Sequence, residues 1–256
     1  MGGPCYLLVD VQQPADAAAA TNAAAAAVGR MKAGVSSKPR QRVRGPRATD
    51  NFAVDPFTFD GARWQSVEQC YQAHKFLDPS KREAIRQILP HAVPQESDHS
   101  YGLRVWRMGA SGTLRDDWDA VKVEIMLSVC RSKLAAHEAL REQLLGTGDA
   151  PIVGGPSTEW HGASGHHGWS TWNGRINELL REELRQAASG GAPSAKLVQL
   201  RAVFADYMEA EGGAKHPLPQ GAPAPAPTPQ PTTAASVARS DAVELSPSTG
   251  APDPDH

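Results

Sequence analysis

The sequence lacks the features that mark secreted and membrane proteins. Its three cysteines, Cys5, Cys70 and Cys130, are odd in number and far apart in 256 residues. They therefore indicate neither a disulfide framework nor a CxxC metal site, and we expect a reducing compartment. No apolar run is long enough to span a bilayer, and the first residues lack the basic segment and apolar core of a signal peptide. We therefore expect a soluble cytoplasmic protein, and a nuclear location is left open.

Strong net charge is also absent. The formal charge is −2, from 26 basic and 28 acidic side chains, so the overall charge favours neither a nucleic acid nor a membrane as partner. The length and the 40% share of hydrophobic residues allow one domain of average size and substantial additional sequence.

The two ends of the chain differ in composition from its middle. Residues 12–36 are dominated by alanine, and residues 38–47 hold five basic side chains and two prolines, which is unsuited to a core. Residues 213–256 contain ten of the 21 prolines. We therefore predict a disordered leader over 1–48 and a disordered or polyproline-like tail over 213–256, whose protein partners are unknown. The basic cluster could instead contact nucleic acid or act as a nuclear address.

The most informative segment is SVEQCYQAHKF, residues 66–76. Ser66 followed three residues later by Gln69 forms a capping-box pattern, so we expect a helix that begins at Ser66. Side chains able to take part in chemistry share one arc of this helix: Glu68, Tyr71, Gln72 and Lys75. The opposite arc carries Val67, Cys70, Ala73, His74 and Leu77. The alternative is an ordinary solvated face on an amphipathic helix.

Short patterns surround this helix. Residues 56–65, PFTFDGARWQ, predict an aromatic hairpin with Asp60-Gly61 at the turn, which leads directly into the helix. Charge pairing, apolar stripes and stop signals predict further helices over 79–89, 116–134, 137–145, 172–187 and 195–211. The last of these is amphipathic, and we expect it to pack outside the main domain or against a partner. The fold class is α+β, mainly helical.

The order of these motifs resembles the NADAR family, also called YbiA-like. The likeness runs from Asn51-Phe52 through NF…PF.F.G..W.SVE..YQ..KF and continues in RDDWD at 115–119, LLGTGD at 144–149 and WNG at 172–174. It covers about residues 49–186. The resemblance implies a single NADAR-like domain over 49–187, flanked by tails, and N-glycosidase activity.

An N-glycosidase must stabilise positive charge on a sugar ring while the bond from the anomeric carbon to a base nitrogen breaks. We expect Glu68 to supply the carboxylate. Gln72 and Tyr71 could bind a ribose hydroxyl or a base edge. Lys75 could hold a phosphate, assist the leaving group or, with a lowered pKa, attack an opened sugar aldehyde. This chemistry needs no cofactor.

A flat base also needs a surface to stack on. Among six tryptophans we expect most in the core, but Trp160 lies in a glycine-rich loop where it could cover a ligand. Trp64 is a second candidate, and the resemblance implies a binding role for Asn173. Ser157 stands where the family commonly has an Asp, and His161 where it commonly has a Gly. Glu159 could replace that carboxylate, although adjacent residues of an extended chain point in opposite directions.

A metal site is the less favoured interpretation of the histidines. Cys70 and His74, together with His161, His166 and His167, could in principle form a tetrahedral site. However, the first two lie on the arc expected to face the core, and no spacing matches a zinc template. We therefore expect no metal.

Three functions stay open from the sequence. The first is hydrolysis of an N-glycosidic bond in a phosphorylated ribosyl or ADP-ribosyl compound, such as a riboflavin-pathway intermediate or an ADP-ribosylated base. The second is an inactive module of the same fold that binds ADP-ribose or an NAD-like ligand, motivated by the departures at Ser157 and His161. The third is an interaction protein that uses its tails and terminal helix. Nucleic acid is expected only as an ADP-ribosylated substrate, and no membrane partner is expected.

Overall fold

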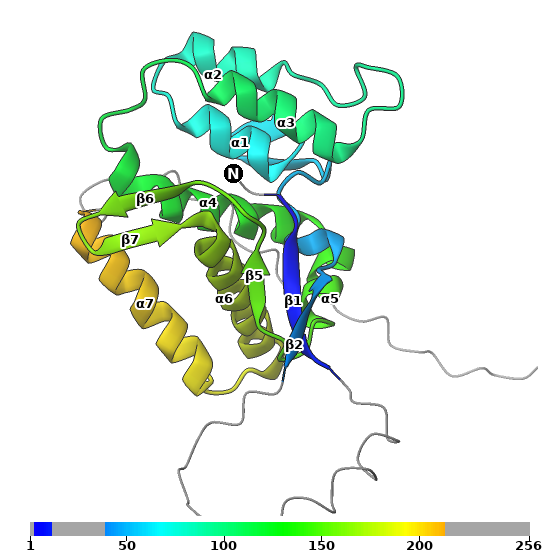
Figure 1. The fold of residues 1–256 in the computed structure, drawn as a ribbon, viewed down its shortest axis with the longest axis vertical. Coiled ribbons are helices and arrows are strands. Elements are labelled where there is room, and N and C mark those ends of the chain that lie inside the picture. Colours follow the sequence, from blue (N-terminus) through cyan, green and yellow to red (C-terminus); the bar gives the residue numbers. More distant parts are fainter. Residues whose placement is uncertain (1–2, 12–38, 213–256) are drawn as a thin grey trace, which may run out of the picture. The chain divides into compact units, whose positions relative to one another are not determined.

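A computed structural model of the protein describes residues 3–11 and 39–212 (Figure 1). The helices are α1 (Val67–His74), α2 (Pro79–Arg86), α3 (Asp98–Gly109), α4 (Trp118–Ala136), α5 (Glu138–Leu145), α6 (Trp169–Ser189) and α7 (Ala195–Glu211), with a short 3-10 helix η2 (Arg47–Thr49). The strands are β1 (Cys5–Asp10), β2 (Arg40–Arg44), β3 (Phe57–Phe59), β4 (Ala62–Trp64), β5 (Ile152–Gly154), β6 (Glu159–Gly162) and β7 (Gly165–Gly168). The predicted α+β, mainly helical fold is confirmed. The predicted tail over 213–256 and the alanine-rich segment lie outside the described residues.

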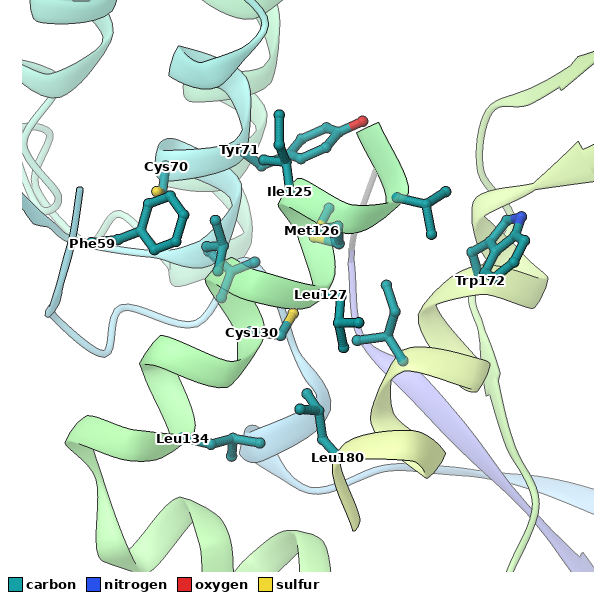
Figure 2. Packing of buried hydrophobic residues seen from close by; sticks show 14 of the residues in the cluster. Phe59, Cys70, Tyr71, Ile125, Met126, Leu127, Cys130, Leu134, Trp172 and Leu180 are labelled. Atoms are coloured by element: carbon teal, nitrogen blue, oxygen red, sulfur yellow. The ribbon is translucent and has the colours of Figure 1, made fainter. Parts of the chain in front are cut away.

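Helix α4 lies at the centre of the core and packs against α1, α5, α6, α7 and β3. Figure 2 shows Ile125, Met126 and Cys130 of this helix between the side chains of α1 and those of α6. A helix with neighbours on several sides must be apolar around most of its circumference, which explains the long apolar run in its sequence. Within the described residues, no helix is both long and apolar enough to cross a membrane.

The aromatic hairpin is confirmed. Strands β3 and β4 pair in register, with Phe57 opposite Trp64. Asp60 and Gly61 have φ angles of 50° and 69°, the left-handed values that a two-residue type I′ turn requires at both positions. Since the inward side chains are buried, the hairpin holds the residues before α1 against the core.

The prediction of a disordered leader over 1–48 is wrong for residues 5–10 and 40–44. Strand β1 pairs antiparallel with both β2 and β5, in the order β2-β1-β5. Cys5 is fully buried, and its carbonyl accepts a hydrogen bond from the Gly45 N–H at 2.9 Å. The basic composition misled the prediction because β2 is an edge strand with exposed side chains, where charged residues are well suited.

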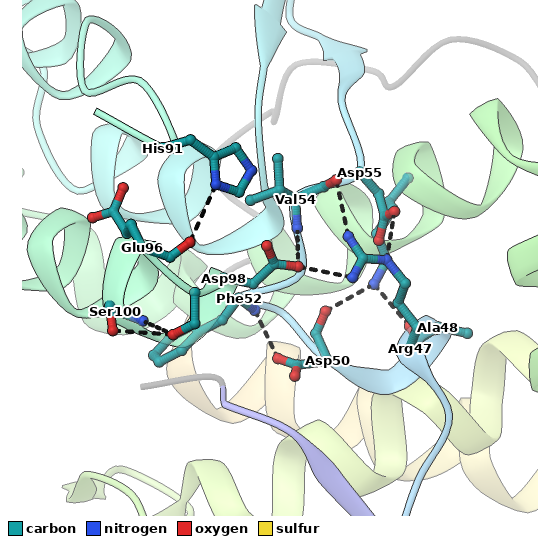
Figure 3. Close-up of polar contacts among 12 residues, drawn as sticks. Arg47, Ala48, Asp50, Phe52, Val54, Asp55, His91, Glu96, Asp98 and Ser100 are labelled. Atoms are coloured by element: carbon teal, nitrogen blue, oxygen red, sulfur yellow. Dashed lines mark hydrogen bonds and ion pairs between the residues drawn. The ribbon is translucent and has the colours of Figure 1, made fainter. Parts of the chain in front are cut away.

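The segment after β2 is fixed by Arg47 (Figure 3). Its guanidinium donates to Asp55 Oδ1 at 2.9 Å and to Asp98 Oδ2 at 2.8 Å. Asp98 Oδ2 also accepts from the Val54 N–H at 3.1 Å. One arginine therefore joins η2, the loop before β3 and the first turn of α3, the helix that the sequence patterns did not reveal.

Helix α7 has the predicted bounds and continues the core. Leu197, Leu200, Phe204 and Tyr207 are buried, and the helix packs against α6 and α4. Ser194 caps its start by accepting from the Leu197 N–H at 3.1 Å.

Candidate active site

Helix α1 begins as its sequence predicts. Ser66 Oγ accepts a hydrogen bond from the Gln69 N–H at 3.1 Å, whereas Gln69 Oε1 accepts from the Gln65 N–H at 2.8 Å rather than from the cap residue itself. All eight residues of α1 are buried, so its polar arc is not a solvated face. Leu77 was expected on the apolar arc but is 66% exposed, because the helix ends before it.

The polar arc holds a buried carboxylate and amide. Glu68 is fully buried, and its Oε1 accepts a hydrogen bond from Gln72 Nε2 at 2.7 Å. Because the amide NH2 group is the donor in this bond, the amide nitrogen faces Glu68. The other end, Gln72 Oε1, is buried and receives no hydrogen bond within the described part of the chain. A buried acceptor of this kind is costly unless a water or ligand donates to it.

Gln72 forms part of the wall of a cavity of about 110 Å³. Helices α1, α3, α4 and α6 and the segment at β6 contribute the lining, which consists of Tyr71, Gln72, Lys75, Trp106, Trp118, Lys122, Thr158, Trp160 and Trp169. Ligand pockets usually exceed about 300 Å³, so only part of a nucleotide-sized ligand would enter this one.

Aromatic rings form a continuous wall around the cavity. The Tyr71 ring centroid lies 5.1 Å from that of Trp118 and 5.3 Å from that of Trp169. Trp160 packs on Trp169 at 5.2 Å. These spacings are typical of favourable ring contacts, so the wall is a preformed surface on which a planar group can stack.

Two ammonium groups face this wall. Lys75 Nζ lies 5.8 Å from the centre of the Tyr71 ring and donates to the Gly109 carbonyl at 3.4 Å. Lys122 Nζ lies 4.1 Å from the centre of the Trp160 ring and pairs with Asp119 at 2.7 Å. Burial lowers the pKa of both lysines, against the opposing effects of Glu68 on Lys75 and of Asp119 on Lys122. The cavity therefore concentrates positive charge in a poorly solvated space.

Lys122 is the charged cavity residue that sequence reasoning missed, and Thr158 and three tryptophans not singled out from the sequence, Trp106, Trp118 and Trp169, also line the cavity. Lys122 lies one helical turn after Trp118 on α4, and both line the cavity. The spacing of four residues was the available signal, since it places two side chains on the same face of a helix.

Not every predicted site residue reaches the cavity. The structure brings together Tyr71, Gln72, Lys75 and Trp160. Glu68 lies behind the wall, in contact with Gln72.

Trp64, Asn173 and Glu159 lie elsewhere. Trp64 is a core residue whose Nε1 donates to the Phe59 carbonyl at 3.1 Å. Asn173 is buried, and its Oδ1 accepts from Asn51 Nδ2 at 3.4 Å. The Glu159 side chain is 62% exposed and pairs with His166 at 3.2 Å. On strand β6 it alternates with the cavity-lining Trp160, so it points away.

The described residues contain no group of three histidine, cysteine or carboxylate side chains placed to hold a metal ion. His74 Nδ1 instead lies 2.7 Å from the Cys70 carbonyl, inside the domain.

Gly109 leaves the space that the Gln72 amide occupies. A Cβ at this position would lie 2.0 Å from Gln72 Oε1 and 2.7 Å from its Cδ. We expect Gly109→Ala to lower the free energy of unfolding by about 1–3 kcal/mol, because the Gln72 amide must leave the space beside residue 109. Urea unfolding measures this change.

A second variant isolates the cause of the Gly109→Ala effect. Adding Gln72→Ala removes Oε1 and Cδ, the two nearest clashing atoms, and leaves only the Cβ at 2.8 Å, so the double variant should lose less stability than the sum of the single variants. Strictly additive losses of unfolding free energy would mean that a Cβ at position 109 does not clash with the Gln72 side chain.

Residues 36–175 match the family model for the NADAR domain. The protein belongs to the NADAR domain family.

Its relatives include named enzymes. The chain is 34% identical over 140 residues to the N-glycosidase YbiA of Escherichia coli, a match that covers 54% of this chain and 79% of that protein. It is 31% identical over 142 residues to an N-glycosidase of Nostoc punctiforme, covering 54% and 86%. A riboflavin biosynthesis protein of Vibrio vulnificus is 31% identical over 140 residues, which is 35% of its length and 54% of this chain. The NMR structure of Escherichia coli YbiA has 33% identity, a TM-score of 0.43, and coverage of 57% of this chain and 82% of that one.

Proposed function

We propose that the protein hydrolyses the N-glycosidic bond of a phosphorylated ribosyl or ADP-ribosyl compound. One observation carries the proposal: an aromatic-walled cavity is lined by a buried lysine, a half-buried lysine and an amide whose unsatisfied oxygen is fixed by a buried carboxylate. The names of the relatives support the reaction class.

In this proposal Glu68 stabilises the positive charge that develops on the sugar. Because it lies behind Gln72, it acts across the amide and not against the ring. Charges interact strongly across such short, poorly solvated distances. The same hydrogen bond leaves Gln72 Oε1 as the acceptor for a ribose hydroxyl or a base N–H.

Lys75 and Lys122 would bind the phosphate of the substrate, while the tryptophans hold the base. We expect Lys75→Gln and Lys122→Gln each to raise KM about tenfold for a phosphorylated substrate, the size of one lost charged hydrogen bond. Steady-state assays on the same compound with and without its phosphate check this. An equal loss on both compounds would contradict phosphate binding by these lysines.

The lowered pKa of Lys75 gives this binding a pH dependence. Its ammonium is present at neutral pH and is lost as the pH rises through a value below the usual 10.5. Affinity for the phosphorylated ligand should therefore fall with rising pH in that alkaline range.

A substrate panel tests the function itself. The full chain is incubated with ribosylated pyrimidine phosphates, NAD, ADP-ribose and ADP-ribosylated nucleic acid, and released base and sugar phosphate are measured. Release from one class assigns the substrate. Absence of turnover and of binding across the panel would overturn the proposal.

A binding module for ADP-ribose or an NAD-like ligand is the second candidate. It is favoured by one observation: no carboxylate is among the residues that line the described cavity, and Glu159 points away from it. Tight binding of ADP-ribose without turnover would support this candidate. A cytoplasmic location stays a prediction for either function.

A further inference from the structure

Helix α7 lies outside the part of the chain that matches the family, yet its last residue contacts the β6–β7 hairpin that carries Trp160. The Glu211 carboxylate accepts hydrogen bonds from the Ala163 N–H at 3.1 Å, the Ser164 N–H at 3.0 Å and the Ser164 hydroxyl at 2.8 Å. Its side chain is 6% exposed. One buried carboxylate therefore satisfies the donors of the hairpin turn.

The Glu211 carboxylate lies at the C-terminal end of α7, where a negative charge is unfavourable. The C-terminal end of a helix carries partial negative charge, so an acidic residue there is unfavourable. Burial also raises the pKa of Glu211, but the hydrogen bonds from Ser164 and Ala163 outweigh burial and keep the pKa below its usual value. The hairpin donors thus offset both penalties, and each bond to the carboxylate is charge-assisted.

The hairpin is shaped to receive Glu211. A Cβ on Gly162 would lie 2.4 Å from Glu211 Oε1, so only glycine leaves room for the carboxylate. Gly162 and Trp160 are two residues apart on β6 and therefore share one face of the strand. Glu211 consequently contacts the same face of the hairpin that presents Trp160.

A second contact from α7 lies one turn earlier. His167 is the cross-strand partner of Trp160, and their ring centroids are 5.6 Å apart. The Tyr207 ring meets His167 edge-on at 5.0 Å. His167 Nε2 also lies 2.9 Å from the Ser164 hydroxyl. Helix α7 therefore supports the hairpin at its turn and at the residue paired with Trp160.

We propose that α7 fixes Trp160 in the cavity wall and that Glu211 is a positioning residue for the proposed reaction. With the turn held, Trp160 stays packed on Trp169 at 5.2 Å and beneath Lys122 at 4.1 Å. The consequence for substrate rests on the proposed function, whereas the positioning of Trp160 does not depend on it.

Full-length variants test the positioning without any ligand. We expect Glu211→Ala and Gly162→Ala to speed hydrogen exchange at the Ala163 and Ser164 amides by about tenfold or more. The matched control is Glu209→Ala, an exposed carboxylate on the same helix, and it should leave exchange unchanged. Near-ultraviolet circular dichroism is sensitive to the packing of the tryptophan rings. Glu211→Ala and Gly162→Ala should each produce most of the change in the spectrum that Trp160→Phe produces. Spectra and exchange that match the control would overturn the proposal.

The activity measurement separates positioning from general stability. On a substrate found by the panel, Glu211→Ala should raise KM about tenfold and change kcat by less than about twofold, since it loosens a binding wall. Faster exchange with an unchanged KM would overturn the functional role of α7. Absence of turnover in the wild-type protein would count against the proposed function alone, because exchange and circular dichroism still decide whether α7 positions Trp160.

Discussion

Glu68→Gln is expected to lower kcat by roughly 10²- to 10⁴-fold, equivalent to about 2.7–5.5 kcal/mol of transition-state stabilisation. The substitution keeps the size of the side chain and an oxygen that can accept from Gln72 Nε2, now 2.7 Å from Glu68 Oε1. It removes the negative charge that would act across the Gln72 amide on the positive charge developing on the sugar. Steady-state kinetics on the substrate found by the panel measure the effect.

The matched control for this variant is Glu142→Gln, an exposed carboxylate on α5. It changes the net charge equally and should leave kcat unaltered. The melting temperature of Glu68→Gln should stay close to that of the wild type. A fully active and folded Glu68→Gln protein would remove Glu68 from the mechanism.

Gly174→Ala should produce the largest loss of stability that we expect from a single added methyl group. A Cβ on Gly174 would lie 2.1 Å from the Ile152 carbonyl oxygen and 3.2 Å from the Val153 Cα. These are backbone atoms of β5, so helix α6 must separate from the strand. We expect a loss of about 3 kcal/mol in unfolding free energy. For a domain of this size that corresponds to a fall of roughly 6–12 °C in melting temperature.

Gly191→Ala provides the control for glycine replacement. Its Cβ would meet Ser189 Oγ at 3.7 Å, an ordinary van der Waals distance. Calorimetry should therefore show little change for this variant. A comparable loss in both proteins would mean that chain flexibility, and not the α6–β5 contact, explains the effect of Gly174→Ala.

Local sequence patterns were sufficient to predict those parts of the structure that depend only on residues close together in the chain. Ser66 and Gln69 predicted the start of α1 because a cap involves groups only three residues apart. Asp60-Gly61 predicted the hairpin turn because its positive φ angles favour those residues. The arc of Tyr71, Gln72 and Lys75 followed from helical geometry in the same way.

Contacts between distant segments were not predictable in this way. Strand β1 is stabilised by partners that come from residues 40–44 and 152–154. Lys122 lines the cavity through a contact with Trp160, a residue 38 positions away along the chain that belongs to a separate strand. Glu159 failed as a cavity residue because the strand places Trp160 inward and its neighbour outward.

Strand β1 is the central strand of its sheet, so the folded domain begins earlier in the chain than the family match does. The family match begins at residue 36, which includes β2 but not β1. A protein cut there would keep two strands, β2 and β5, that have lost the shared neighbour to which both are hydrogen-bonded. It would also leave empty the space now filled by Cys5, whose Sγ accepts a hydrogen bond from Asn177 Nδ2 at 3.6 Å. The cooperative folding unit therefore includes a strand contributed from well before the recognisable family region.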